Sequence, residues 1–179
     1  MNSPKLQILP VVSVPFEENA YIVHLAGDRR CLVIDPGLEP NRIVQEIDAN
    51  GLTPVAILNT HGHGDHIAGN AALKERWPEC PLLIGEGDAE KLVDPRQNLS
   101  ATFGISLISP AADILVADEN VYPAAGMDIR VMAIPGHSAG HVVYLIEGCN
   151  PPTVFVGDVI FQGSIGRTDF PDGDFQALA

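Results

Sequence analysis

The sequence predicts a layered α/β sandwich in which helices cover β-sheets, and three observations support this fold class. The first third of the chain is rich in β-branched residues, arranged in short runs that end at turn residues. Amphipathic helical segments then alternate with short apolar runs, the pattern of strands that are buried on both faces. Candidate ligand residues directly follow three of these strands, and sites in layered α/β proteins collect at the carboxyl ends of strands.

The expected strands are defined by apolar or β-branched runs between turn residues. Turns such as Gly27-Asp28 and Asp35-Pro36-Gly37 separate three runs near the start of the chain, and five more runs follow. The expected strands cover residues 5–14, 20–25, 31–34, 54–58, 82–84, 128–134, 141–147 and 153–156. The run at residues 54–58 is continuously apolar, which indicates a strand in the middle of a sheet.

Helical periodicity is clearest in residues 41–49, where three branched apolar residues share one face. Gly51 follows this segment and is placed to end the helix. Further helices are expected at residues 67–76 and 86–93. Residues 97–110 show no clear period, so we expect a surface excursion there.

The composition is that of a globular protein with an excess of acidic residues. Hydrophobic residues make up 46% and charged residues 18%, and 179 residues suffice for one core, so a single domain over residues 1–179 is expected. No apolar run approaches the roughly 20 residues that span a membrane. The N-terminal segment lacks the pattern of a signal peptide. The net charge of −13 repels phosphate groups, so neither nucleic acid nor a membrane is an expected partner.

The cysteines are few and far apart. Cys31, Cys80 and Cys149 form an odd set without a shared motif. In a chain without a secretory signal, we expect them to be reduced thiols of the core and the protein to be cytoplasmic. None lies near another cysteine, so a metal-binding role is not expected for them.

The segment NTHGHGDH, residues 59–66, contains three of the 6 histidines in the chain. A catalytic zinc ion needs about three protein ligands and keeps one coordination position open. His61 and His63 alternate in a turn after a strand, so both can face one ion. Asp65 and His66 can turn toward a second position about 3.5–4 Å away. A structural zinc site would use cysteines, and none is near, so the segment predicts a catalytic metal site.

Two later residues follow strands in the same way. His137, in the segment PGHSAGH, is a candidate third ligand for the first ion. Asp158 follows the run TVFVG, and the two oxygens of one carboxylate can bridge two ions. A turn-forming role for Asp158 is the alternative, but apolar residues follow it. We expect His141 to orient or pack beneath the site, and we expect His24 to be structural.

The segments THGHGDH, PGHSAGH and FVGD together resemble the metallo-β-lactamase superfamily. The stretch GSIGRTDFP at residues 163–171, with NAY at 19–21 and IDPG at 34–37, resembles in particular its glyoxalase II branch, the hydroxyacylglutathione hydrolases and their small bacterial relatives. The resemblance covers nearly the whole chain and implies an αββα metallo-β-lactamase sandwich. It implies six metal ligands, with His61, His63 and His137 on the first ion, Asp65 and His66 on the second, and Asp158 between them.

The same resemblance implies a metal-dependent hydrolase that cleaves a thioester such as S-lactoylglutathione through a metal-bound hydroxide. The expected cofactor is Zn²⁺, as one or two ions, with iron or manganese as alternatives. A metal ion lowers the pKa of bound water and stabilises the oxyanion that forms at the thioester carbonyl. Asp65 is expected to be catalytic. Arg167 resembles a basic position that faces the carboxylate of a thiol conjugate, the alternative being an ion pair with Asp169 or Asp172.

The chain departs from the family pattern at its end. The family supplies one more histidine to the second ion, in a late PGHG-like segment, and no histidine follows His141 here. Residues 174–179 resemble the opening of a helix, so we expect the closing strand and helix of the sandwich to be lacking. The expectation that follows is tight binding of the first ion and weak or absent binding of the second.

Other functions remain open beside thioester hydrolysis. A persulfide dioxygenase with a single iron would use His61, His137 and Asp158, and such enzymes share the fold and a GRTDF-like segment. A truncated homologue that binds metal without turnover is a further alternative. β-Lactam hydrolysis is disfavoured, because one major group of those enzymes has cysteine where Asp158 stands. Nuclease activity is disfavoured by the charge of −13.

Overall fold

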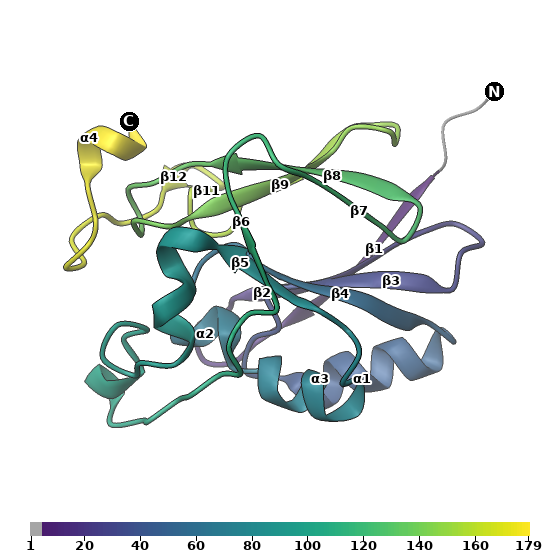
Figure 1. The fold of residues 1–179 in the computed structure, drawn as a ribbon, viewed down its shortest axis with the longest axis horizontal. Helices are drawn as coiled ribbons and strands as arrows, with labels where there is room; N and C mark the ends of the chain where they lie inside the picture. The colour runs from purple at the N-terminus through teal and green to yellow at the C-terminus, as the bar shows by residue number, and fades with distance from the viewer. Residues whose placement is uncertain (1–4) are drawn as a thin grey trace.

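Two β-sheets pack face to face in the computed structural model, which describes residues 5–179 (Figure 1). The larger sheet has the strand order β1-β2-β3-β4-β5-β6, and the smaller one has the order β10-β9-β8-β7. The bounds in the larger sheet are β1 Leu6–Val12, β2 Asn19–Leu25, β3 Arg30–Ile34, β4 Thr53–Asn59, β5 Leu82–Gly85 and β6 Ile114–Val116. Those in the smaller sheet are β7 Val121–Ala124, β8 Met127–Ala133, β9 Val142–Ile146 and β10 Thr153–Phe155. A separate hairpin joins β11 (Ile160–Phe161) to β12 (Ser164–Ile165).

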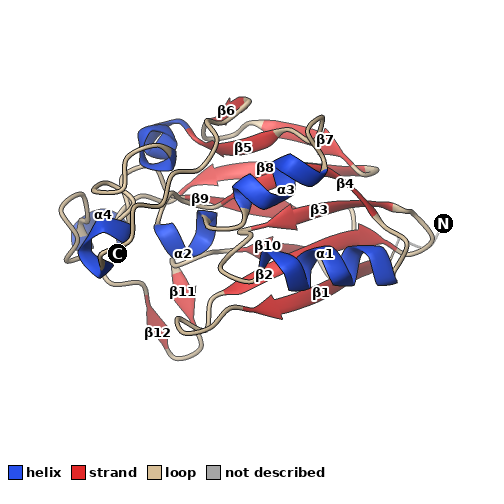
Figure 2. Cartoon of the chain, turned by 90° about the horizontal axis from the view of Figure 1, so that it is seen from below, coloured by secondary structure: helices blue, strands red, loops and turns tan. Residues whose placement is uncertain are grey.

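Helices cover the outer face of the larger sheet, where α1 and α3 lie side by side (Figures 1 and 2). The helical segments are α1 Pro40–Ala49, α2 Gly64–Ile67, α3 Asn70–Arg76, the 3₁₀ helices η1 Glu86–Leu92 and η2 Ser100–Phe103, and α4 Phe175–Leu178. No helix lies over the outer face of the smaller sheet in Figure 1. Within residues 5–179 the layers are therefore helix, sheet and sheet.

Parallel pairing brings several strand ends to one edge of the molecule. Strands β3, β4, β5 and β6 are parallel, so the segments carrying Asp35, His61 and Asp88 leave the larger sheet on the same side. In the smaller sheet β8 and β10 both pair antiparallel with β9, so they also share a direction. His137 and Asp158 follow these two strands. The expectation that ligand candidates follow strand ends is confirmed.

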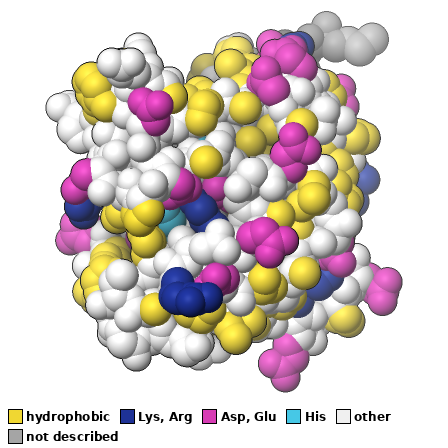
Figure 3. Space-filling model, turned by 60° about the vertical axis from the view of Figure 1, so that its left-hand side comes forward, with side chains coloured by type: hydrophobic (Ala, Val, Ile, Leu, Met, Phe, Trp, Pro, Cys, Tyr) yellow, Lys and Arg dark blue, Asp and Glu magenta, His cyan; other side chains and the backbone are white. Residues whose placement is uncertain are grey.

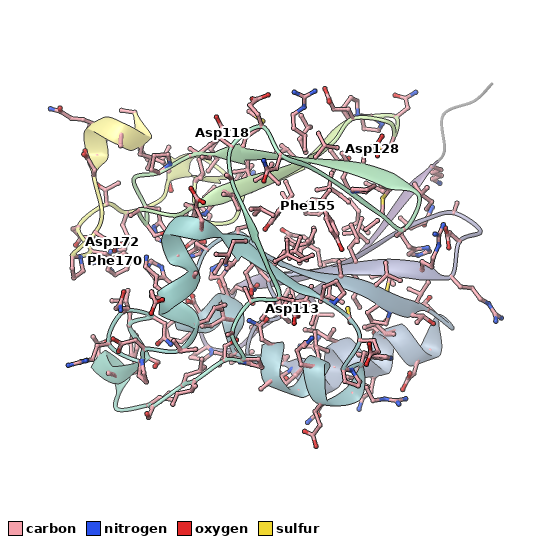
Figure 4. The ribbon with its side chains drawn as sticks, in the orientation of Figure 1. Asp113, Asp118, Asp128, Phe155, Phe170 and Asp172 are labelled. Carbon is pink, nitrogen blue, oxygen red and sulfur yellow. The ribbon has the colours of Figure 1, made fainter. Side chains whose placement is uncertain are left out.

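Two apolar clusters hold the layers together. One lies between the sheets and includes Leu58, Ile129 and Phe155, whose side chain points into this space in Figure 4. The other lies between the larger sheet and its helices. Tyr144 of β9 is fully buried and donates its hydroxyl proton to the Asn59 carbonyl oxygen, at 2.9 Å. This bond ties the smaller sheet to the end of β4, directly before the histidine segment.

The eight expected strands and the helix at residues 41–49 are confirmed, with ends that differ by at most two residues. The helix expected to open after Asp174 is confirmed as α4, because the Asp174 carboxylate accepts from two amides of its first turn. Strands β6, β7, β11 and β12 were not predicted. Three of these four have only two or three residues, too few for a period to show, and β7 is an edge strand that contains Pro123.

The single helix predicted at residues 67–76 is wrong, because the chain forms α2 and α3 instead. The Gly69 amide donates to the Pro36 carbonyl oxygen and not to a residue of its own helix. A Cβ atom at Gly69 would lie 2.6 Å from that oxygen, so the contact requires glycine. The backbone turns at this contact, and Asp65 and His66 therefore lie on a short helix of their own.

The helix predicted at residues 86–93 is the tighter 3₁₀ helix η1. In 3₁₀ geometry residues three apart lie directly above each other, and Asp88 and Lys91 form a buried ion pair at 3.2 Å. The surface excursion predicted at residues 97–110 is only partly correct. Asn98 is fully buried and donates to the carbonyl oxygens of Lys91 and Leu107, so this loop is anchored to the body of the protein.

The structure also bears on the other global expectations. All three cysteines are buried and free of disulfides, as expected. Within residues 5–179 no helix has the length and apolar character needed to cross a bilayer. Residues 1–4, part of the segment that predicts the lack of a signal peptide, lie outside the described residues.

Candidate metal centre

Three buried histidines from two segments face one another at the edge where the strands end. His63 Nδ1 lies 3.0 Å from His61 Nε2 and 2.9 Å from His137 Nε2. All three rings are at most 4% exposed. Their facing nitrogens form a group of potential metal-ligand atoms that lie within 4.8 Å of one another. The structure thus brings together the three residues predicted for the first ion.

The remaining ring nitrogens fix the orientation and tautomer of two of these histidines. Thr60 donates its hydroxyl proton to Asp35 at 2.7 Å, so its oxygen is left to accept from His61 Nδ1 at 3.1 Å. His137 Nδ1 lies 2.9 Å from the Arg167 carbonyl oxygen, which can only accept. Both rings therefore carry their proton on Nδ1 and direct the lone pair of Nε2 toward His63.

This arrangement leaves lone pairs that protons cannot satisfy. Burial, reinforced by the neighbouring imidazoles, lowers the pKa of His61 well below its usual value and that of His63 to about 2. Burial also lowers the pKa of His137. With all three rings neutral, His63 Nδ1 can donate at most one proton to the two Nε2 atoms that face it, and His63 Nε2 is buried without a partner. Converging nitrogen lone pairs are the donor set of a divalent transition-metal site, so the residues fit such an ion.

A second group of ligand atoms lies beside the first. His66 Nε2 is 3.3 Å from one oxygen of Asp158, and the other oxygen is 3.4 Å from His137 Nε2. The two oxygens of this carboxylate thus face both groups, as the bridging prediction requires. His61, His66 and Asp158 also lie close enough together to hold an ion. Asp65 is farther away, with its Oδ2 atom 3.9 Å from His66 Nε2, and it belongs to neither compact group.

Carboxylates on both sides set the charge of His66. Burial alone lowers its pKa, but Asp158 and Asp35 together raise it well above the usual value. Burial by itself raises the pKa of Asp158. The nearby histidines, His66 foremost, lower it by more than burial raises it, so the pKa falls to about 2. Asp158 is thus held as a carboxylate, the form that binds a metal ion.

His141 packs against the first histidine group, and His24 lies outside both groups of ligand atoms, as expected from the sequence. His141 is buried, stacks on the ring of His61 with centroids 4.8 Å apart, and accepts from the Asp158 amide at 3.2 Å. Burial lowers its pKa to about 3, so it supports the site as a neutral ring. His24 lies on β2, with its Nδ1 atom 3.1 Å from the Leu25 carbonyl oxygen, and belongs to neither ligand group.

Asp35 is a site residue that the sequence reasoning did not assign. It is buried at the end of β3, with φ of 47°, and accepts from the Thr60 amide and hydroxyl, both at 2.7 Å. Its second oxygen also lies 3.2 Å from His66 Nδ1. The available signal was its place directly after a predicted strand, in the Asp35-Pro36-Gly37 turn and in the IDPG segment that resembles the family, although neither pattern gave it a role.

Asp88 is a second unassigned residue, and nothing in the sequence singled it out. Its side chain is fully buried between the two loops that carry the first histidine group. It accepts from the amides of Gly62 and Gly140 and from the Ser138 hydroxyl, each at 2.8 Å. One carboxylate therefore fixes the His61–His63 loop to the loop that follows His137.

The segment before α4 closes one side of the centre. Phe170 packs its ring edge-on against His63 and His137, with centroid distances of 4.9 and 5.5 Å. Arg167 forms two bonds with Asp169, at 2.6 and 2.7 Å, and its guanidinium lies over Phe170. Asp172, the other predicted partner of Arg167, instead pairs with Lys91 at 2.6 Å.

Comparison with known proteins agrees with this fold and centre. The sequence profile of the Metallo-beta-lactamase superfamily matches residues 14–179. The chain is 37% identical to the probable metallo-hydrolase YqgX of Bacillus subtilis over 165 residues, which cover 92% of this chain and 76% of that protein. It is 30% identical to the hydroxyacylglutathione hydrolase GloC of Haemophilus influenzae over 180 residues, which cover 97% of this chain and 80% of that protein.

A solved structure gives the same result. The BLEG-1 B3 metallo-beta-lactamase superposes with a TM-score of 0.90 at 32% sequence identity, covering 96% of this chain and 81% of that one. The chain therefore belongs to the metallo-beta-lactamase superfamily, and the class of protein that its fold and histidine centre define is a metallo-hydrolase.

Proposed function

We propose that this metallo-hydrolase cleaves thioesters. The observation that carries the proposal is the convergence of lone pairs from His61, His63 and His137 next to the Asp158 carboxylate, at the wall of a cavity large enough for a small ligand. Further support comes from the similarity to the hydroxyacylglutathione hydrolase GloC, whose named substrate is a thioester. Neither a serine nor a cysteine nucleophile is part of this centre.

In this proposal the first ion is held by His61, His63 and His137, with zinc as the expected metal and iron or manganese as the alternatives. A bound divalent ion lowers the pKa of water and polarises a carbonyl oxygen, which is the chemistry that thioester hydrolysis needs. Thr60 and the Arg167 carbonyl group hold the imidazole rings in the tautomer that presents Nε2.

The other side chains bind, orient and shield. Asp65 borders both cavities beside the centre, and we assign it the role of accepting a proton from the attacking water. His66 and Asp158 are the remaining ligands for a second ion, with Asp65 as a further, more distant candidate. His61 belongs to both ligand groups, so a second ion has fewer ligands of its own, and we expect it to bind more weakly. Phe170 covers the His63 and His137 rings and limits the access of bulk water.

The test combines metal analysis with a thioester assay. The purified protein is expected to retain at least one equivalent of metal after dialysis and to release free thiol from S-lactoylglutathione. His61→Ala should lose both the metal and the activity, whereas His24→Ala, a histidine outside the centre, should keep both. Binding of two equivalents of metal with equal affinity would refute the expectation that the second ion binds more weakly than the first. Bound iron with oxygen uptake on glutathione persulfide, and no thiol release from thioesters, would refute the thioester proposal.

A second candidate, β-lactam hydrolysis, is supported by the similarity to the BLEG-1 B3 metallo-beta-lactamase, at 32% identity and a TM-score of 0.90. The same metal chemistry attacks an amide carbonyl in that case. A chromogenic cephalosporin assayed next to the thioesters separates the two functions. Turnover of the cephalosporin without thiol release would favour this candidate over the first.

A further inference from the structure

A cavity of about 530 Å³ adjoins the metal centre on the side of His63 and His137, and we call it the apolar cavity. Its volume lies in the range of sites for small ligands, roughly 300–1,000 Å³. Half of the lining side chains are apolar, and those that carry the argument come from three distant parts of the chain. The ones that matter here are Phe16, Leu99, Phe103, Ile105, Leu107 and Phe170.

Several of these side chains are exposed although they are large and apolar. Phe103 is 64% exposed, Ile105 53% and Phe16 46%. The rings of Phe16 and Phe103 contact each other edge-on, with centroids 5.3 Å apart, and so join two segments that are distant in sequence. In Figure 3 a histidine lies inside a hollow that has hydrophobic side chains at its edge. Exposed apolar side chains gathered around a polar centre are typical of a ligand-binding site.

The charges around the centre do not suit an anionic ligand. A second cavity of about 490 Å³ borders the other side of the centre, and its lining includes Glu17, Glu18 and Asp35. Among the described residues that line either cavity, Arg167 is the only lysine or arginine. Its guanidinium already binds both oxygens of Asp169. Glutathione carries more carboxylates than ammonium groups, so neither cavity offers its carboxylates an unpaired cation.

We propose that the apolar cavity binds the acyl group of the substrate and that the preferred thioesters carry an apolar acyl chain or ring. This rests on the proposed thioester hydrolysis. Biological thiol carriers are polar and charged, so the apolar part of a natural thioester is its acyl group. The cavity meets the centre at His63, His137 and Asp158, which places an acyl chain in it next to the scissile carbonyl group.

The expected effect follows from the burial of methylene groups. Each methylene group that moves from water into an apolar site contributes about 0.8 kcal/mol, which corresponds to roughly a fourfold change in kcat/KM. Thioesters of N-acetylcysteamine, a small neutral thiol, provide the series. The value of kcat/KM should rise from acetyl through butanoyl to hexanoyl, and S-lactoylglutathione should be a poorer substrate than hexanoyl-N-acetylcysteamine. A flat series, or a preference for S-lactoylglutathione, would overturn the proposal.

Two matched variants test the cavity itself. Phe103→Ser should reduce the ratio of kcat/KM for the hexanoyl and acetyl thioesters at least fivefold, because it removes an apolar wall. Phe175 is a suitable control because it is 61% exposed and does not line the cavity. Phe175→Ser should leave the ratio unchanged. Equal ratios in Phe103→Ser and the unchanged protein would contradict the assignment.

A binding measurement separates this inference from the proposed function. Hexanamide cannot be cleaved as a thioester, and calorimetry should show that it binds more tightly than acetamide, with Phe103→Ser removing the difference. If thioesters are cleaved but hexanamide binds no better than acetamide, the cavity inference fails and the hydrolase proposal stands. If no thioester is cleaved, the proposed function fails and this inference fails with it.

Discussion

The buried Asp88 carboxylate joins the two loops of the metal centre, and its removal should be costly. Asp88→Ala leaves two buried donors and one half-buried donor without their acceptor, namely the Gly62 amide, the Ser138 hydroxyl and the Gly140 amide. Each unsatisfied donor costs about 1 kcal/mol or more. Lys91 also loses one of its two carboxylate partners and keeps Asp172. Because Lys91 keeps one carboxylate partner, its charge is not left unpaired, and the three donors together with the weakened ion pair give an expected loss of about 4 kcal/mol in the free energy of unfolding.

Urea denaturation of the metal-free protein measures this loss. Ser138→Ala removes only one of the bonds and should cost about 1 kcal/mol. Glu86→Ala, an exposed acidic residue in the same 3₁₀ helix, is the matched control and should change stability by less than about 0.5 kcal/mol. A loss for Asp88→Ala that is no larger than the loss for Glu86→Ala would refute the reasoning.

The same variants have a second readout in metal affinity. Asp88 positions the backbone between His61 and His63 and does not itself belong to either ligand group. Replacing a residue that orients metal ligands typically lowers affinity by about 10–100-fold. Competition with a zinc chelator should show such a loss for Asp88→Ala and none for Glu86→Ala. Unchanged affinity in a destabilised Asp88→Ala would mean that the carboxylate stabilises the fold without positioning the histidines.

Three further predictions concern pH, metal and the break between α2 and α3. Burial raises the pKa of Glu18 to about 8 from the usual 4.5, so its stabilising contribution is complete below pH 4.5 and is lost as the pH rises through about 8. As the pH rises between these limits, the unchanged protein should lose roughly 1.4 kcal/mol more free energy of unfolding per pH unit than Glu18→Gln, as measured by urea denaturation. Equal dependence of the free energy of unfolding on pH in the two proteins would contradict the raised pKa of Glu18. Chelation should lower the free energy of unfolding by about 4 kcal/mol relative to protein with metal at 1,000 times its Kd, measured by thermal unfolding; no change would argue against a site in the native state. Gly69→Ala places a Cβ atom 2.6 Å from the Pro36 carbonyl oxygen and should lower the free energy of unfolding by about 1–3 kcal/mol. The neighbouring control Ala68→Gly should lower it by about 1 kcal/mol or less. A larger loss for Ala68→Gly than for Gly69→Ala would contradict the close contact.

The sequence by itself determined eight of the twelve strands in the described residues, the longest helix and the position of the ligand candidates. Strands and α1 follow local periodicity, which each segment carries within a few residues. His61, His137 and Asp158 were recognisable because each follows such a strand. The strand before His61 belongs to the parallel part of the larger sheet, and β8 and β10 share a direction because both pair antiparallel with β9. What was predicted wrongly, such as the helix at residues 67–76, depended on a bond between Gly69 and Pro36 that local sequence does not contain.

The tertiary structure alone decided which partner each polar side chain has and which surfaces meet. Asp88 was not recognisable from the sequence, because the three groups that donate hydrogen bonds to it lie 26 to 52 residues away. Arg167 could have paired with Asp169 or Asp172, and packing gave Asp172 to Lys91. The apolar cavity unites Phe16 and Phe170 from two loops with Phe103 from the 3₁₀ helix η2. Local sequence patterns indicate which residues are buried and which are candidate metal ligands. The distances between these residues are set only by the tertiary fold.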